Sequence, residues 1–251
     1  MLQTEDIKVS FGAVQAVRGI SLEVARNELL GIVGPNGSGK TTFLNALSGI
    51  VPASGRMVFE GREIRLGRPQ EVWSSGITRV FQAPQVVESL TCLENVLIGC
   101  RHRRASGLSS TWRRHWMAKH ERQRWRAALD ALEQVDIAAL ADDKAGAISY
   151  GQKRLVEVAR AIAGQPRLML LDEPSAGLND AETASLSAQL AAIRDNGTTL
   201  VVVDHKIDFL ESICSRIAVF HLGEFVASGP PKVLWQNELV IQAYLGTVGH
   251  A

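Results

Sequence analysis

Residues 34–41 have the types and spacing of a phosphate-binding loop. They read Gly-Pro-Asn-Gly-Ser-Gly-Lys-Thr and match the pattern Gly-x4-Gly-Lys-Thr. Glycines let a backbone curl so that several N–H groups point at one phosphate chain, and a following helix adds its positive end. Lys40 can then reach the β- and γ-phosphates of a nucleotide, and the Thr41 hydroxyl can bind Mg²⁺. The spacing therefore predicts a site for a nucleoside triphosphate with magnesium.

The sequence on either side of this loop supports the prediction. The apolar run 29–33 before it indicates a buried strand, and residues 42–47 after it indicate a helix. A plain glycine-rich turn is the alternative, but such a turn needs neither the strand nor the helix. The residues assigned to nucleotide binding here are Gly34, Pro35, Asn36, Gly37, Ser38, Gly39, Lys40, Thr41 and Thr42.

Two adjacent acids follow a second apolar strand, 168–171. Asp172 fits the carboxylate that a phosphate-binding loop needs to hold Mg²⁺ through its water shell. Glu173 is one residue further and should point to the other side of the chain, where it can orient or deprotonate the water that attacks the γ-phosphate. An acid pair that starts a helix before Pro174 is the alternative, and it leaves the four apolar residues in front unexplained.

Residues 149–152, Ser-Tyr-Gly-Gln, precede an amphipathic pattern with apolar residues at 155, 158, 159 and 162. Ser149 at the N-cap with Gln152 three residues later predicts a capping box. A helix start with an exposed hydroxyl and a glycine N–H also favours anions. Because one chain already encloses its nucleotide with the 34–41 loop, a phosphate bound here would belong to a second subunit.

Length and composition restrict the class of protein. The chain has 251 residues, of which 46% are hydrophobic, so it can bury the core of one large domain or of a domain with a subdomain. The apolar stretches are too short to span a bilayer, and the first six residues lack a signal pattern, which predicts an intracellular protein. The three cysteines, at 92, 100 and 214, have no metal-binding spacing and suit a reducing compartment.

The net charge is only +1, but its distribution is uneven. Residues 101–126 hold nine Lys or Arg and one acid, which leaves 18 bases and 25 acids elsewhere. A solvated helical face is the favoured interpretation of this segment. Contact with anionic lipid headgroups and, with Trp112, Trp116 and Trp125 interleaved, nucleic-acid binding are the alternatives.

Hydrophobic periodicity predicts an α/β fold interrupted by a helical insert at 91–163. Within the insert, Trp125, Leu129 and Leu132 form an apolar stripe of a helix that should end near Val135. A turn is expected at Pro52–Gly55. Strands are expected at 2–10 and 15–24 around Gly12, and at 29–33, 57–59, 76–81, 168–171, 199–203, 216–220 and between Gly223 and Gly229. Helices are expected at 42–47, 180–194, from 206, and twice after Pro231.

In chain order, these motifs resemble the ATP-binding cassette (ABC) ATPases. The set comprises the 34–41 loop, Gln82 after a strand, the signature 149–152, the acid pair 172–173, the loop 175–179 and His205 after the strand 199–203. The resemblance covers nearly the whole chain. It implies a P-loop NTPase (RecA-like) core sheet with an N-terminal antiparallel β layer, formed by 1–90 and 164–251, and a helical signature subdomain at 91–163.

The resemblance also implies roles for single residues. Phe11 would stack on adenine, Gln82 would sense Mg²⁺ and the attacking water, and His205 would contact the γ-phosphate. The expected catalytic residues are Glu173, His205 and Gln82, and the expected metal site is Thr41, Gln82 and Asp172. Ser149, Tyr150, Gly151 and Gln152 would face the nucleotide of the partner in a head-to-tail dimer.

Two positions depart from the usual family pattern. Tyr150 stands in place of the first glycine of the signature, and Asn179 stands in place of an Asp. Phosphate binding should survive because Ser149 and Gly151 remain, whereas charge-based dimer contacts at Asn179 are put in doubt. These two residues and the ending at 242–246, Gln-Ala-Tyr-Leu-Gly, resemble the branched-chain amino acid importer subfamily.

The function expected from this resemblance is that of the ATP-hydrolysing, energy-coupling subunit of an importer for branched-chain amino acids or similar small amphipathic solutes. Its cofactors would be ATP and Mg²⁺. Its partners would be transmembrane permease subunits, a second ABC ATPase subunit and, indirectly, a periplasmic or extracellular solute-binding protein, at the cytoplasmic face of the membrane. The alternatives are an exporter subunit, a nucleic-acid-associated ABC ATPase and a P-loop kinase. No nucleic acid is expected because the chain has neither two cassettes nor a long coiled-coil insert.

Overall fold

The computed structural model describes residues 1–100 and 110–245, with the side chains of 1–100 and 120–242. The chain divides into two compact units. The first, called the core unit here, comprises Met1–Gln82, Arg167–Ala176 and the chain from Thr183 onward. The second, called the helical unit, comprises Ala83–Pro166 and Gly177–Glu182.

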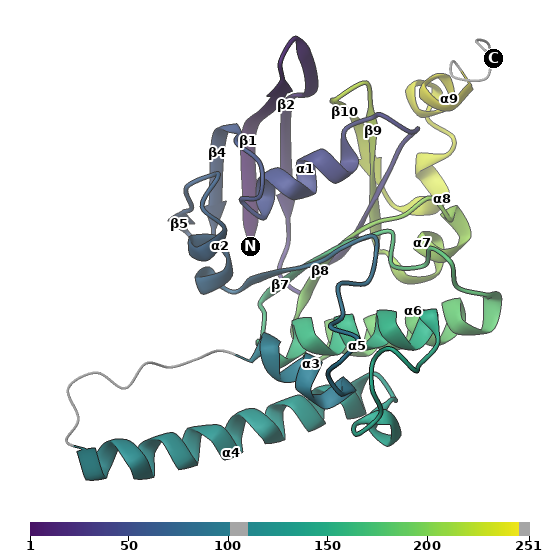
Figure 1. Ribbon diagram of the computed structural model, residues 1–251. Coiled ribbons are helices and arrows are strands. Elements are labelled where there is room, and N and C mark those ends of the chain that lie inside the picture. The colour runs from purple at the N-terminus through teal and green to yellow at the C-terminus, as the bar shows by residue number, and fades with distance from the viewer. Residues whose placement is uncertain (101–109, 246–251) are drawn as a thin grey trace. The chain divides into compact units, whose positions relative to one another are not determined.

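The core unit is built on a six-stranded, mainly parallel sheet (Figure 1). Its strands lie in the order β10–β9–β3–β8–β7–β6, and β10 runs antiparallel to β9. The strands are β3 (Leu29–Val33), β6 (Ile77–Val80), β7 (Leu168–Asp172), β8 (Thr199–Val203), β9 (Arg216–His221) and β10 (Glu224–Gly229). Every residue of β3, β7 and β8 is buried, as is typical of parallel strands covered on both faces. The strands predicted in these segments are confirmed.

The parallel strands carry the predicted motifs to one edge of this sheet. β3 leads into the 34–41 loop, β7 ends in Asp172 with Glu173 after it, and β8 is followed by Asp204 and His205. β6 ends at Val80, two residues before Gln82. Because β3, β8, β7 and β6 pair in parallel, their carboxyl ends meet at the same edge, where α/β proteins bind ligands.

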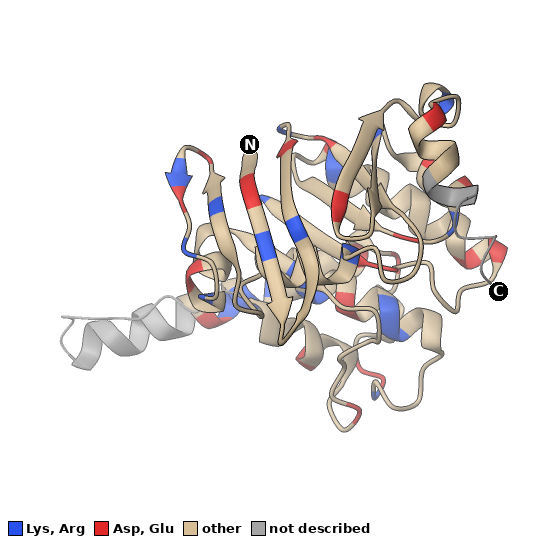
Figure 2. Ribbon diagram, turned by 90° about the horizontal axis from the view of Figure 1, so that it is seen from above, with Lys and Arg blue, Asp and Glu red and all other residues tan. Residues whose placement is uncertain are grey.

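A four-stranded antiparallel sheet forms the second layer of the core unit. Its order is β2–β1–β4–β5, with β1 (Leu2–Phe11), β2 (Val14–Val24), β4 (Ser54–Phe59) and β5 (Arg62–Glu63). Leu2 lies opposite Val24 and Ile7 opposite Ile20, so the predicted N-terminal layer is confirmed. Figure 2 shows charges of both signs on these strands, and they form the ion pairs Lys8–Asp6, Arg56–Glu5 and Arg56–Glu63.

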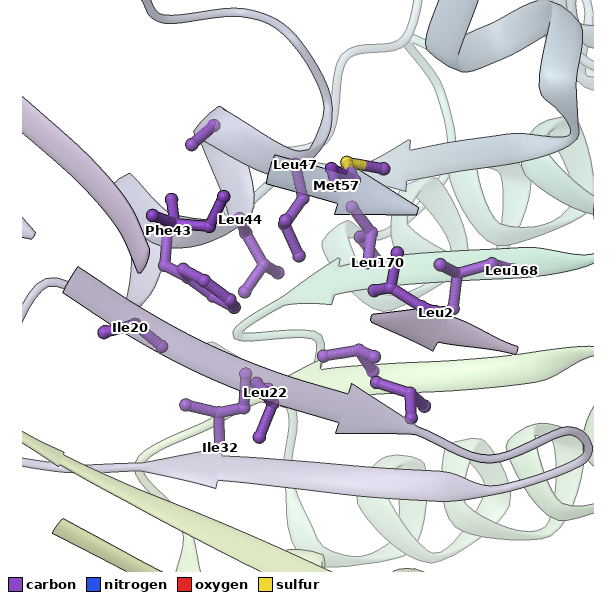
Figure 3. Close-up of a cluster of buried hydrophobic side chains, with 14 of the residues drawn as sticks. Leu2, Ile20, Leu22, Ile32, Phe43, Leu44, Leu47, Met57, Leu168 and Leu170 are labelled. Atoms are coloured by element: carbon purple, nitrogen blue, oxygen red, sulfur yellow. The ribbon is translucent and has the colours of Figure 1, made fainter. Parts of the chain in front are cut away.

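The main hydrophobic core joins the two sheets through helix α1 (Lys40–Leu47). Phe43, Leu44 and Leu47 of α1 are fully buried or nearly so, and they belong to one cluster with residues of both sheets. Figure 3 shows these side chains with Leu2, Ile20, Leu22, Ile32, Met57, Leu168 and Leu170. The helix that follows the phosphate-binding loop is therefore anchored between the two sheets.

The remaining elements of the core unit agree with most of the expected ones. They are α2 (Pro69–Ser75), α6 (Asp180–Asp195, whose first turn belongs to the helical unit), α7 (Ile207–Ile213), α8 (Pro231–Leu234) and α9 (Glu238–Leu245). Helix α1 begins at Lys40, two residues earlier than predicted, and the sequence prediction missed α2 and β5. The turn expected at Pro52–Gly55 is wrong in its second half because Ser54 and Gly55 already belong to β4.

The helical unit contains α3 (Cys92–Gly99), α4 (Ser110–Gln134), a 3-10 turn η1 (Ala138–Leu140) and α5 (Tyr150–Ala163). Helices α3, α4 and α5 pack against one another. Helix α3 begins with a capping box, in which the Thr91 hydroxyl accepts from the Glu94 N–H and the Glu94 carboxylate accepts from the Thr91 N–H. The described residues of 91–163 are thus mainly helical, as expected, while the compact unit extends beyond these bounds to 83–166 and 177–182.

The apolar stripe predicted on α4 is wrong in two of its three positions. Trp125 and Leu129 are 41% and 39% exposed, whereas Leu132 is fully buried. Among the described side chains of α4, Ala128, Ala131 and Leu132 are buried, and Val135, directly after the helix, continues their i, i+3, i+4, i+7 spacing. Small alanines allow α4 to pack closely against its neighbours, and a stripe traced through the large side chains misses them.

Three further expectations concern the chain as a whole. The three cysteines are buried free thiols, as predicted. Residues 101–109 of the basic segment, and the side chains through 119, lie outside the described residues. Within the described part of the chain, no helix is long and apolar enough to span a membrane.

Candidate nucleotide-binding and hydrolysis site

The phosphate-binding loop depends on glycine at two positions where the backbone is crowded. Gly34 has φ 155°, and a Cβ there would lie 2.1 Å from the carbonyl oxygen of Phe220. Gly39 has φ 91°, and its Cβ would lie 2.5 Å from the carbonyl oxygen of Ala16. Only a residue without a side chain fits at either position, because the backbone of β9 lies close to Gly34 and the backbone of β2 lies close to Gly39.

Lys40 lies inside the curve of this loop. Its Nζ donates to the carbonyl oxygens of Gly34, at 2.7 Å, and Pro35, at 3.0 Å, and lies 3.5 Å from the Ser38 hydroxyl. Burial lowers the pKa of the Lys40 ammonium group, and the carboxylates of Glu173 and Asp172 oppose that shift. The loop therefore holds a cation at the position where a phosphate chain would enter.

Asp172 is 2% exposed and has a different partner on each carboxylate oxygen. Oδ1 accepts a hydrogen bond from the Thr41 hydroxyl at 3.1 Å, and Oδ2 accepts one from Arg79 Nη2 at 2.8 Å. Burial raises the pKa of Asp172, while Arg79 and the Thr41 hydroxyl lower it. The same Arg79 nitrogen donates to Asn45 Oδ1 at 3.2 Å.

The Thr41 hydroxyl and the Asp172 carboxylate fit Mg²⁺. Both offer hard oxygen ligands, and the two oxygens are 3.1 Å apart. Magnesium in proteins is usually held by one or two such side chains, with water and substrate phosphates completing its octahedron. Among the described residues no cluster of three His, Cys, Asp or Glu could hold a metal ion.

Glu173 meets Gln82 and His205, two residues predicted from separate motifs. Gln82 Nε2 donates to Glu173 Oε2 at 2.7 Å, and His205 Nε2 lies 2.8 Å from Glu173 Oε1. Because an ionised carboxylate only accepts hydrogen bonds, His205 Nε2 carries the proton in this pair. Glu173 shares none of these partners with Asp172, so the two adjacent carboxylates have separate hydrogen-bonding environments.

The signature residues form the predicted capping box in the helical unit. The Ser149 hydroxyl accepts from the Gln152 N–H at 3.2 Å, and Gln152 Oε1 accepts from the Ser149 N–H at 2.8 Å. Ser149 is exposed and Gly151 is buried. A Cβ on Gly151 would lie 2.6 Å from Glu182 Oε1, so a larger residue there would require the Glu182 side chain to move.

The two departures from the family pattern have structural roles in the helical unit. The Tyr150 ring lies against Gly177, where an added Cβ would be 3.0 Å from Cε1 of the ring. Asn179 caps α6: its Oδ1 accepts from the Glu182 N–H at 2.9 Å, and Glu182 Oε2 accepts from the Asn179 N–H at 3.0 Å. An Asp at 179 could make the same cap, so the local fold of this loop does not need the charge.

Phe11 lies at the end of β1, opposite Val14 in the hairpin, and is 53% exposed. An aromatic ring exposed at a hairpin end is available for stacking. Two polar residues that were given no role from the sequence contact predicted site residues: Arg79 donates to Asp172, and Asp204 accepts from the His205 N–H. Asn45 and Ser175 in turn contact Arg79 and Asp204. Arg79 could have been noticed as a charge within the otherwise uncharged strand 77–80, and Asp204 as an acid that follows a buried strand, as Asp172 does.

Comparison with known proteins identifies the family of this chain. The family model described as "ABC transporter" matches residues 17–176. The chain belongs to the ABC transporter family. It is an ATP-hydrolysing cassette of that family, and the resemblance inferred from its motifs is confirmed.

One curated relative is the high-affinity branched-chain amino acid transport ATP-binding protein BraF of Pseudomonas aeruginosa. This chain is 34% identical to it over 249 residues, which cover 98% of each protein. A nucleotide-free ATP-binding cassette from an ABC transporter matches with a TM-score of 0.84 and 32% identity, over 97% of this chain and 98% of that one. A dimeric cassette in a post-hydrolysis state, bound to ADP and Pi, matches with a TM-score of 0.75 and 25% identity, over 92% and 99%.

Proposed function

We propose that this ABC cassette powers a membrane importer and that its hydrolysis centre is Glu173, held between Gln82 and His205. The observation that carries the proposal is the pair of contacts at 2.7 and 2.8 Å, which fix one carboxylate at the edge of the sheet that also carries the phosphate-binding loop. Glu173 is the predicted general base for the attacking water. Thr41 and Asp172 supply the oxygen ligands for Mg²⁺.

The chain's own residues account for the steps of hydrolysis. The backbone N–H groups of the 34–41 loop and the ammonium group of Lys40 bind the phosphates. Bound magnesium would neutralise charge on the β- and γ-phosphate oxygens. Glu173 takes a proton from the attacking water, while Gln82 and His205 hold its two oxygens in a fixed orientation. His205 is also the residue proposed to contact the γ-phosphate, as the family resemblance implies.

The proposed solute is a branched-chain amino acid or a similar small amphipathic molecule. Support comes from the relative named above, which shares 34% of its residues over nearly the full length. Tyr150 and Asn179 are two further features typical of that subfamily. No described residue would touch the solute, because the described part of the chain has no helix able to span a membrane. Solute selection would then belong to the permeases and a solute-binding protein.

The proposed assembly pairs two cassettes with transmembrane permease subunits at the cytoplasmic face of the membrane. Each signature, Ser149–Gln152, would bind the nucleotide held by the partner cassette. The dimeric cassette structure supports this arrangement, since its chain is similar to this one over 92% of the length. A periplasmic or extracellular solute-binding protein would act on the permeases and not on this chain.

The solute assignment is tested by deleting the gene and following the uptake of labelled leucine, isoleucine and valine. Urea and an aromatic amino acid serve as comparison solutes. We expect the uptake of the three aliphatic amino acids to fall together and to return when the gene is restored. Normal uptake of all three, in a strain without a second importer and with another solute lost, would reject the assignment and leave the ATPase proposal intact.

A further inference from the structure

Asp204 is a buried carboxylate at the centre of a hydrogen-bond network that the proposed mechanism does not yet use. It follows β8 directly and is 3% exposed. Its Oδ1 accepts hydrogen bonds from the Ser175 hydroxyl at 2.8 Å, the His205 N–H at 2.8 Å and the Lys206 N–H at 3.0 Å. Its Oδ2 accepts from the Ser175 N–H at 3.1 Å.

These donors belong to two different loops of the core unit. Ser175 lies two residues after Glu173, whereas His205 and Lys206 start the connection to α7. A backbone hydrogen bond from the Glu173 N–H to the Val203 carbonyl, at 2.7 Å, joins the same two loops. The Asp204 carboxylate and this backbone bond therefore tie the loop that carries Glu173 to the loop that carries His205.

We propose that Asp204 is a positioning residue for hydrolysis, which sets the 2.8 Å contact between Glu173 and His205. The inference rests on the proposed function, because it assumes that these two residues act at the γ-phosphate. Glu173 has a long side chain and a φ of 46°, which non-glycine residues rarely adopt, and His205 is 44% exposed on its side chain. Their relative position must therefore be fixed by the backbone of their loops.

A simpler explanation of the hydrogen bonds of Asp204 is that its side chain only stabilises a local turn at the start of α7. Aspartate side chains often accept hydrogen bonds from the N–H groups that follow them, and this accounts for the bonds from His205 and Lys206. It does not account for Ser175, which is 29 residues away and donates to both oxygens. The two bonds from Ser175 are the ones that make Asp204 a link between the loops.

The test compares graded variants of the full chain. Asp204→Asn keeps the shape of the side chain but replaces one of its two acceptor oxygens by an NH₂ group. At least one of the groups that donate to Asp204 then loses its acceptor. Ser175→Ala removes only the hydroxyl donor. A displacement of about 1 Å can reduce turnover about 100-fold. We expect kcat to fall about 10-fold or more in Asp204→Asn and less in Ser175→Ala, with the KM for ATP within about twofold of the parent.

Thr199→Val is the matched control. Thr199 is fully buried at the opposite end of β8, where its hydroxyl accepts from the Asn27 N–H at 3.0 Å. This variant also loses a buried hydrogen bond of the core unit, but it touches neither loop. It should lower the melting temperature and leave kcat within about twofold of the parent when assayed well below that temperature.

A double-mutant cycle distinguishes positioning from general damage. If Asp204 acts through His205, Asp204→Asn should change the residual kcat less than about twofold in a His205→Ala background. Equal losses in both backgrounds, or a loss in Thr199→Val as large as in Asp204→Asn, would overturn the proposal. If Asp204→Asn fails to fold, the same cycle with Ser175→Ala tests the proposal by the same criterion. Full activity of Glu173→Gln would instead reject the hydrolysis site itself.

Discussion

At the scale of single residues, the backbone at Glu173 separates two adjacent carboxylates. Asp172 ends β7 in a buried strand conformation, and Glu173 immediately adopts φ 46°. A left-handed conformation of a non-glycine residue costs on the order of 1 kcal/mol. The surrounding loops stabilise it through the Glu173 N–H bond to Val203 and the side-chain bonds to Gln82 and His205. Asp172 can thus serve a metal ion while Glu173 serves a water molecule.

Glu173→Gln should retain ATP binding and lose turnover. Glutamine has the shape of glutamate, so ATP affinity should stay within about threefold of the parent. It cannot take a proton from water, and loss of a general base lowers kcat by about 100-fold or more. Binding of a fluorescent ATP analogue and release of phosphate measure the two effects separately. A variant that turns over at the parental rate would show that Glu173 is not the base.

Lys40 should make ATP binding sensitive to alkaline pH. Its folded-state pKa is lowered from 10.5 by burial, so the free protein loses this positive charge at a lower pH than an exposed lysine would. ATP affinity should therefore decline as the pH rises through that lowered pKa, and Lys40→Ala should bind weakly at every pH. The measurement is ATP affinity against pH for both proteins. A parallel decline in the alanine variant would assign the effect to another group.

At the scale of elements, the Tyr150 ring and Gly177 connect the signature to the loop before α6. Gly177→Ala should lower the free energy of unfolding of the chain by about 1–2 kcal/mol, because φ 76° disfavours alanine and because the Cβ would approach the ring to 3.0 Å. In a Tyr150→Ala background only the backbone cost remains, so the loss should be smaller. Urea unfolding of the four proteins measures this coupling. An equal loss in both backgrounds would exclude strain between the ring and the added methyl group.

The elements that the sequence predicted best are those whose local pattern and tertiary setting agree. The strand at 29–33 and the helix after the phosphate-binding loop are indicated both by the local pattern and by the motif, and the structure contains both, with the helix starting two residues earlier than predicted. The stripe on α4 failed because its packing surface uses alanines, whose size gives little periodic signal. Arg79 and Asp204 were missed because their partners, Asp172 and Ser175, are 93 and 29 residues away in the chain. Such pairings depend on the sheet order, which the sequence pattern did not provide.

At the scale of the whole molecule, two copies should associate only around ATP. Of the signature residues Ser149–Gln152 only Tyr150 is a large aromatic residue, and the phosphate-binding loop is rich in glycine. Neither surface therefore offers an extended apolar face that would bind a partner without nucleotide. Phosphates between a loop of one copy and a helix start of the other would supply the attraction. Because the parental protein hydrolyses its ATP, we expect its closed dimer to be scarce.

Glu173→Gln should remove that limitation, because we expect this variant to hold ATP without hydrolysing it. Light scattering should give a mass about twice that of one chain for this variant with ATP and Mg²⁺, and the mass of one chain with ADP. Adding Ser149→Ala removes a hydroxyl that would face the partner's phosphates and leaves each copy's own ATP site unchanged, so it should weaken the dimer while single-copy ATP binding persists. Equal masses with ATP and ADP would argue against a nucleotide sandwich. Dimers that are unaffected by Ser149→Ala would mean that the copies meet through another surface, and the signature would then need a different role.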